Sequence, residues 1–165
     1  MAKESKGNKK NMIKSIIQYP NETLRKVQLD IHSYKSVKLI IEDMFETVNA
    51  VDGLGLSAIQ IGYPLKLFVL NPKHFIYFAD IWKRPLFFPN VTILKQEGNS
   101  LSREGCLSIP GFSIDVARPT KMTIQYGYEG AYRHLTIQDQ LVCAVLSHEI
   151  DHCNGRLIID YDWSL

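Results

Sequence analysis

The segment His148–His152 reads H-E-x-x-H, and no other feature of this sequence constrains its fold and chemistry as strongly. Residues i and i+4 of an α-helix lie on one face, so His148 and His152 can hold one metal ion between them. Glu149 lies beside that face and can act as a base toward a water molecule on such a metal. The pattern therefore indicates a metal-dependent hydrolase built on a helix. A catalytic site of this kind also needs a third protein ligand.

Two common sources of a third ligand are missing after the motif. The longer metzincin pattern continues through Gly155 and then needs a histidine, where this sequence has Ile158. A thermolysin-like site needs a glutamate well downstream, but the residues after His152 include only Asp160 and Asp162 as acids. The third ligand is therefore expected upstream.

Two upstream segments stand out. Residues 104–110 read E-G-C-L-S-I-P, and the thiolate of Cys106 is a good ligand for zinc or ferrous iron. Residues 53–60 read G-L-G-L-S-A-I-Q, in which paired glycines allow close backbone approach and Gln60 follows within reach. Taken one at a time, these motifs have simpler interpretations. A lone cysteine is usually a small buried residue, and an H-E-x-x-H pattern also occurs by chance in ordinary helices.

The three segments in this order resemble the peptide deformylase family, which is characterised by G-φ-G-φ-A-A-x-Q, E-G-C-φ-S and H-E-x-x-D-H, where φ is apolar. The resemblance runs from about Ile13 to about Asp160. It implies removal of the N-formyl group from nascent polypeptides that begin with formylmethionine, with release of formate. The chain stops at Leu165 without the long basic helix of typical bacterial members. It thus resembles short forms such as the phage-encoded ones.

The resemblance implies a metal and its ligands. Cys106, His148 and His152 are expected to bind one divalent ion, with Fe²⁺ as the physiological metal. The same ligands accept Zn²⁺, Ni²⁺ or Co²⁺. Glu149 is expected to take a proton from water and deliver it to the leaving amine.

The resemblance also implies the groups that contact the substrate. The Gln60 side chain and the Leu107 backbone N–H are expected to stabilise the oxyanion, and Gly55 to hold the peptide backbone. An apolar slot beside the metal helix is expected to take the methionine side chain, and it consists of Leu54, Leu141, Ala144 and Val145.

Two positions depart from the family pattern, and a third residue, Arg118, is expected to form an ion pair. Ser57 replaces an alanine of the first motif, a small change that should preserve the turn. Ser113 stands where many members carry an arginine near the substrate backbone, so contacts to the peptide chain are expected to differ. Arg118 is expected to pair with Asp52.

Composition indicates one globular domain. Residues 1–11 are predicted to form a disordered Lys-rich arm, and residues 12–165 a single catalytic domain. A net charge of +2 gives no general argument for nucleic acid, so DNA is not an expected partner. A solvated tail is the simpler interpretation of the arm. The alternative is a transient electrostatic contact with ribosomal RNA.

The three cysteines are an odd number and argue against a disulfide framework. No apolar run approaches the roughly 18 residues of a membrane span, and the N-terminus lacks a signal-peptide core. We therefore expect a monomer in the cytoplasm, which is the host cytoplasm for a phage-encoded chain, with no membrane contact. An organelle protein whose transit peptide has been removed would look similar.

Hydrophobic periodicity predicts an α+β fold, with short antiparallel strands packed around a central metal-binding helix. Helices are predicted from about Ser36 to Val51 and from near Thr136 to Gly155. Residues 72–89, with three prolines and several aromatics, are predicted to be irregular. The predicted strands are 67–70, 90–95, 113–116, 121–128 and 132–137, with a hairpin turn at Glu129-Gly130.

Two other functions use the same ligands. One is a different metallohydrolase, such as a peptidase or a small amidase. The other is a non-catalytic zinc-binding interaction module, which is disfavoured because Glu149 and Gln60 have no role in a purely structural site.

Overall fold

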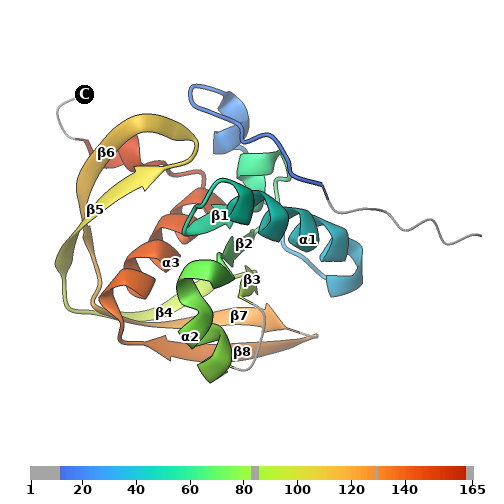
Figure 1. Ribbon diagram of the computed structural model, residues 1–165. Helices are drawn as coiled ribbons and strands as arrows, with labels where there is room; N and C mark the ends of the chain where they lie inside the picture. The colour runs from blue at the N-terminus through green and yellow to red at the C-terminus, as the bar shows by residue number, and fades with distance from the viewer. Residues whose placement is uncertain (1–11, 83–85, 129, 163–165) are drawn as a thin grey trace, which may run out of the picture.

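The computed structural model describes residues 12–82, 86–128 and 130–162, and these residues form an α+β fold (Figure 1). The helices are α1 Tyr34–Ala50, α2 Pro72–Trp82 and α3 Gln140–Cys153, with 3₁₀ turns at η1 Glu22–Arg25, η2 Ala58–Ile61 and η3 Ile158–Tyr161. The strands are β1 Gly55–Ser57, β2 Leu67–Leu70, β3 Phe87–Pro89, β4 Thr92–Glu97, β5 Ser100–Cys106, β6 Ile109–Arg118, β7 Lys121–Tyr128 and β8 Ala131–Ile137.

The strands form separate antiparallel layers around one helix. They pair in the orders β1-β2-β3 and β4-β7-β8, and β5 pairs with β6 as a hairpin. Figure 1 shows α3 between the β5–β6 hairpin and the β1-β2-β3 sheet, and the β4-β7-β8 sheet lies below α3 in this view. The predicted fold class, short antiparallel strands around a central helix, is confirmed.

Helix α3 is apolar on most of its circumference, which explains its central place. Val142, Leu146 and Ile150 are buried in one cluster with Phe68 of β2 and Ile124 of β7. Because these neighbours hold the helix on several sides, the H-E-x-x-H segment is a rigid support rather than a surface feature.

Helix α1 closes the opposite side of the β1-β2-β3 sheet. Its residues Val37, Ile41 and Met44 are buried at helical spacing and form a second cluster with Leu56 of β1 and Val69 of β2. The predicted helix from Ser36 to Val51 is confirmed within two residues.

The β5–β6 hairpin has polar groups on its inner face. Glu104 and Cys106 of β5 are buried toward α3, whereas Arg103 and Gly105 alternate with them and are exposed. A period of two along a strand produces this alternation. The hairpin thereby presents a carboxylate and a thiol to α3.

The prediction that residues 72–89 are irregular is wrong. They contain α2 and β3, separated by the residues 83–85 that lie outside the described part. Asn71 accepts a hydrogen bond from the Lys73 backbone N–H, and Pro72 occupies the first helical position, where a proline costs no hydrogen bond. Of the prolines that suggested irregularity, Pro72 begins a helix and Pro89 ends a strand.

The predicted start of the last helix near Thr136 is also wrong. Thr136 and Ile137 pair with β7 as the end of β8, and the helix begins at Gln140 with Asp139 as its N-cap. The Asp139 carboxylate accepts a hydrogen bond from the Val142 backbone N–H at 2.9 Å. Gly155 follows the helix with a φ of 71°, a left-handed conformation that suits glycine, as expected for a helix stop.

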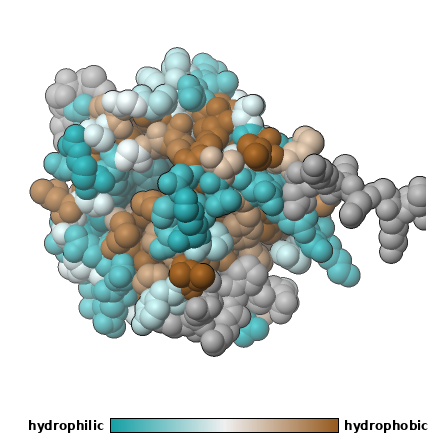
Figure 2. Space-filling view, in the orientation of Figure 1, coloured by the Kyte–Doolittle hydropathy of each residue, from teal (hydrophilic) through white to brown (hydrophobic). Residues whose placement is uncertain are grey.

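The predicted arm, residues 1–11, lies outside the described residues, as does Glu129 of the predicted hairpin turn. No helix in the described part of the chain is long and apolar enough to cross a membrane. On the face shown in Figure 2, hydrophilic residues cover most of the surface and apolar residues lie in separate groups between them.

Candidate active site

The two histidines of α3 lie one turn apart with their rings in contact and nearly perpendicular, at an interplanar angle of 77°. The centroids of His148 and His152 are 5.0 Å apart. His152 is only 1% exposed, and this burial holds its pKa well below the ordinary value, so the ring is neutral. A neutral imidazole is the form that binds a metal.

Cys106 reaches the same point from the end of β5. The strand register changes between Gly105 and Cys106, so that Cys106 pairs with Ile109 at the end of the hairpin rather than with Phe112. The sulfur lies 3.3 Å from Nε2 of His152. Ligand atoms of Cys106, His148 and His152 all lie within 4.8 Å of one another.

Glu104 orients the first histidine. Its Oε2 lies 3.0 Å from Nδ1 of His148, which leaves Nε2 of that ring for the site. Burial opposes a positive charge on His148, but the contacts with Cys106 and Glu104 outweigh it and raise its pKa to about 10. The surroundings of this ring therefore favour positive charge, whether a proton or a cation supplies it.

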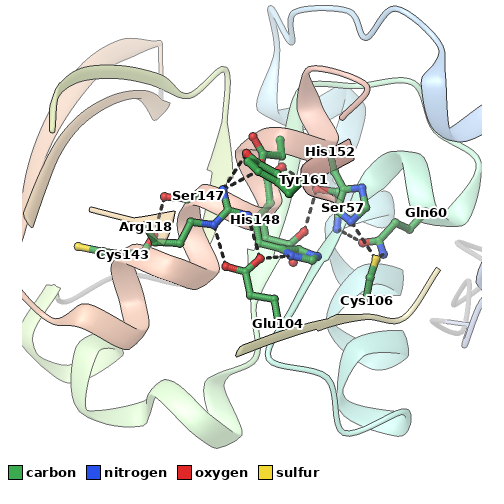
Figure 3. A network of polar contacts seen from close by, with 12 residues as sticks. Ser57, Gln60, Glu104, Cys106, Arg118, Cys143, Ser147, His148, His152 and Tyr161 are labelled. Carbon is green, nitrogen blue, oxygen red and sulfur yellow. Dashed lines mark hydrogen bonds and ion pairs between the residues drawn. The ribbon is translucent and has the colours of Figure 1, made fainter. Parts of the chain in front are cut away.

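A buried ion-pair network fixes Glu104 in turn (Figure 3). Arg118 donates to both oxygens of Glu104, at 2.7 and 2.8 Å, and to Oδ2 of Asp151 at 2.7 Å. Tyr161 donates to the same Asp151 oxygen at 2.8 Å. Burial would raise the pKa of Glu104, but the hydrogen bonds from Arg118 and His148 outweigh it and lower that pKa. Glu104 thus stays ionised.

The expected pair between Arg118 and Asp52 is therefore wrong. Asp52 lies instead beside Lys73 and His74, at 2.7 and 3.0 Å. Arg118 is drawn into the interior because Glu104 and Asp151 are both there to neutralise it.

Glu149 lies next to the ligands, and two contacts hold it. The Ser57 hydroxyl lies 2.9 Å from its Oε2, within hydrogen-bond distance. A Cβ atom on Gly55 would lie only 2.6 Å from its Oε1, so the glycine leaves the space that the carboxylate fills. Burial raises the pKa of Glu149 to about 7, against the opposing effects of His148 and Ser57. A carboxyl group with this pKa can exchange protons near neutral pH.

Gln60 is oriented by its own neighbours. Its Oε1 accepts from the Ser57 backbone N–H at 2.8 Å. Its Nε2 therefore points the other way, 3.1 Å from Oγ of Ser108 and 3.8 Å from the sulfur of Cys106. The amide donors face the cavity at the metal-ligand cluster.

These groups surround a cavity of about 420 Å³. The lining includes Gln60, Leu107, Glu149, Cys106 and His148, whereas His152 is buried and is not part of it. All the predicted substrate-binding residues line the same cavity, namely Gly55, Leu54, Leu141, Ala144 and Val145.

The apolar part of the wall differs in depth. Ala144 and Val145 are buried on α3, while Leu54 and Leu141 are 40% and 54% exposed. The two leucines therefore lie at the mouth of the cavity.

Two supporting residues received no such role from the sequence. Glu104 is part of the E-G-C-L-S segment, and its place two residues before a candidate ligand on a strand is a signal that it faces the same side. Ser57 was treated as a neutral replacement, although a hydroxyl two residues from Gly55 can reach the same carboxylate.

The donor set fits one divalent cation. One sulfur and two imidazole nitrogens are close enough to share an ion, and this mixture suits Fe²⁺ or Zn²⁺. The buried carboxylate beside these ligands is not needed to hold the ion, and a proton-transfer group in that place is typical of a metallohydrolase. The α+β fold and this site thus define a metal-dependent hydrolase.

Comparisons with known proteins identify the family. The polypeptide deformylase family model matches residues 13–163. The peptide deformylase of Bartonella bacilliformis is 36% identical over 154 residues, which cover 90% of this chain and 84% of that protein. That of Rhizobium meliloti is 36% identical over 151 residues, with the same coverage.

Solved structures agree. A peptide deformylase from Legionella pneumophila superposes with a TM-score of 0.79 at 34% identity, covering 90% of this chain and 85% of that one. The enzyme from Ehrlichia chaffeensis in complex with actinonin gives 0.79 at 32% identity, covering 90% and 88%. The chain belongs to the peptide deformylase family. It is a metal-dependent hydrolase that deformylates nascent peptides, which decides against the non-catalytic zinc module.

Proposed function

We propose that the chain removes the formyl group of N-formylmethionyl peptides with the residues described above in defined roles. The observation that carries this proposal is the meeting of Glu149, Gln60 and the Cys106–His148–His152 cluster at one cavity with an apolar wall. Membership of the peptide deformylase family favours this function over a peptidase or amidase of another kind, which could use a similar apolar pocket.

In this proposal Cys106, His148 and His152 hold one divalent ion. A divalent cation in such a site lowers the pKa of water and polarises the carbonyl oxygen of the formyl group. Fe²⁺ is our proposal for the physiological metal, because the thiolate and imidazole ligands suit it. Metal analysis of protein purified without oxygen, compared with protein purified in air, tests the identity of the ion.

Glu149 moves the protons. Its carboxylate takes a proton from the attacking water and delivers it to the amine as the C–N bond breaks. Ser57 and the space at Gly55 keep the carboxylate in one position during both transfers.

Gln60 and Leu107 stabilise the oxyanion that forms on the formyl carbonyl oxygen when water attacks the carbonyl carbon. The Gln60 NH₂ donates without carrying charge, and the Leu107 backbone N–H follows the ligand Cys106 directly. Both donors are fixed before the reaction, which is the condition for such stabilisation to be effective.

The substrate is held by its first residue. The methionine side chain enters the slot formed by Leu54, Leu141, Ala144 and Val145, and the peptide backbone follows β1 at Gly55. An apolar slot of this kind matches the unbranched, polarisable thioether chain.

The Glu149→Gln variant tests the assigned roles. Because the glutamate is not a metal ligand, the variant should keep its metal content and lose about 10²–10⁴-fold in deformylation rate. Formate release is measured together with the bound metal, using formyl-Met, acetyl-Met and unblocked peptides. Near-normal turnover by the fully loaded variant would rule out the role of Glu149. Equal cleavage of acetyl peptides by the unchanged protein would contradict the specificity.

We also propose that the protein acts as a monomer in the cytoplasm and contacts the ribosome transiently through residues 1–11. Three free cysteines suit a reducing compartment, and lysines in the arm suit an RNA surface. Co-sedimentation with ribosomes should be weak, fall steeply with salt and disappear when residues 1–11 are deleted. Tight, salt-insensitive binding by the protein that lacks residues 1–11 would contradict the proposed ribosome contact. A dimer in analytical sedimentation would contradict the proposed monomeric state.

A further inference from the structure

Arg103 is the one charged residue of the cavity wall that the site chemistry leaves unused. The other charged or titratable side chains of the wall, Glu104, His148 and Glu149, are buried or nearly so and engaged with one another or with Ser57. The Arg103 side chain is 64% exposed, and residue 103 belongs to the stretch of β5 that borders the cavity. No other lysine or arginine in the described part of the chain lines this cavity.

The Arg103 side chain leans along the hairpin toward the metal ligands. In the strand register it lies opposite Asp115, whereas Ser113 lies opposite Gly105, the neighbour of Cys106. Nevertheless its NH2 donates to the Ser113 hydroxyl at 2.8 Å, and its ion pair with Asp115 is the longer contact, at 3.5 Å. The serine hydroxyl therefore holds the guanidinium displaced along the hairpin, toward the end of β5 that carries Cys106.

The guanidinium keeps donors for a further partner. An arginine has five N–H donors, and the contacts with Ser113 and Asp115 use only part of them. The ion pair with Asp115 is weak, because both side chains are more than half exposed and the contact is long. An exposed, oriented guanidinium with free donors is a site for a carboxylate, which it can bind through two parallel hydrogen bonds.

We propose that Arg103 recognises a carboxylate in the peptide substrate downstream of the formylmethionine, and this inference rests on the function proposed above. Arg103 lies three residues along β5 from Cys106, about 10 Å of extended strand. An extended peptide covers the same length in about three residues. The carboxylate therefore belongs to the second or third residue of the substrate, as an acidic side chain or, in a short peptide, as the C-terminal carboxylate.

Two pairs of substrates distinguish these sources. One pair consists of formyl-Met tripeptides that end in a free carboxylate or in an amide. The other consists of amide-terminated tripeptides with Glu or Gln at the second position. The unchanged protein should favour the charged member of at least one pair by about three- to tenfold in kcat/KM, chiefly through KM, and salt should reduce the preference.

The Arg103→Gln variant should lose this preference and keep its activity on the uncharged members. Arg133→Gln is the matched control, since Arg133 is an exposed arginine on β8 that does not line the cavity, and it should keep the preference. Asp115→Asn should enlarge the preference, because it removes the carboxylate that competes for the guanidinium.

The outcomes separate the inference from the function on which it rests. An unchanged preference in Arg103→Gln, an equal loss in Arg133→Gln, or no preference in the unchanged protein would each overturn the role of Arg103 while deformylation itself stands. Failure of the unchanged protein to release formate from any of the peptides would overturn the proposed function and this inference with it.

Discussion

At the scale of single residues, the tightest constraint in the site is the approach of Glu149 to the backbone of Gly55. A Cβ on residue 55 would lie 2.6 Å from the carboxylate, so alanine must push Glu149 away from Ser57. We expect Gly55→Ala to lower kcat/KM by about 10- to 100-fold, because small misplacements of a catalytic group have effects of this size. Steady-state kinetics with metal analysis measures the effect.

Gly127→Ala is the control for this prediction. Its Cβ would meet only ordinary contacts, the nearest being the Pro89 carbonyl oxygen at 3.7 Å. Comparable losses in the two variants would mean that the effect of Gly55→Ala is one of general stability rather than of the position of Glu149.

The sequence could indicate the candidate ligands and the candidate base because they occur in short segments with fixed spacing. It gave Glu104 and Ser57 no role, since their importance depends on which distant residues they meet. Glu104 is 44 residues from His148 in the chain, and Ser57 is 92 residues from Glu149. The partner of Arg118 was wrong for the same reason, because spacing along the chain carries no information about a contact made in the interior.

At the scale of elements, the N-cap of α3 supports the metal-binding helix. Asp139 satisfies one of the backbone N–H groups that begin the helix, through the bond to Val142. We expect Asp139→Ala to lower the free energy of unfolding by about 1 kcal/mol, and Asp139→Ser to retain most of it. Urea unfolding monitored by circular dichroism measures both. Equal stability of the alanine variant and the unchanged protein would show that the cap contributes nothing.

Arg118 joins the β5–β6 hairpin to α3. Removal of its guanidinium in Arg118→Leu leaves Glu104 buried without its main partner, and a broken buried ion pair costs about 3–5 kcal/mol. Tyr161→Phe removes the hydrogen bond that the phenol donates to the Asp151 carboxylate and the one that it accepts from Arg118, but it leaves the ion pairs in place and should cost about 1.5–3 kcal/mol. If chemical unfolding shows similar losses for the two variants, Arg118 is not the main link between these elements.

Elements with clear apolar periodicity were predictable, and elements whose pattern is disguised were not. Strand β5 was missed because its inward positions include the charged Glu104, while Leu101 on the outward side is 70% exposed. Helix α2 was missed because Pro72 suggested a break at a position where a helix tolerates proline. In both cases contacts with distant parts of the chain stabilise an element that the local sequence pattern does not indicate.

At the scale of the whole molecule, an ion pair ties the first turn of the described chain to its last. Both guanidinium NH groups of Arg25 donate to Asp160, at 2.6 and 2.7 Å, across 135 residues of sequence. The hydrogen bond from Arg25 is the largest cause of a lowered pKa for Asp160. The folded state therefore binds the acid proton more weakly than the unfolded chain, and stability depends on pH.

We expect Asp160→Asn to lower the free energy of unfolding at pH 7 by about 0.5–1 kcal/mol, the range of an exposed pair. The contribution of a carboxyl group with a lowered pKa is complete above its unfolded value, about 3.9, and is lost as the pH falls through the folded value. The difference between the two proteins should therefore shrink below about pH 4. Denaturant unfolding from pH 3 to 7 measures it, and a constant difference would contradict the assignment.

The position of the candidate metal ligands on two different elements has a consequence for the integrity of the fold. Cys106 ends a hairpin strand and His152 lies on the central helix, 46 residues later. An ion shared between them acts as a cross-link that closes this loop, as a disulfide would, but one whose strength depends on the supply of metal. Each tenfold rise in free metal above the dissociation constant adds about 1.4 kcal/mol to stability. Starvation for the metal would therefore remove activity and weaken the folded molecule at the same time.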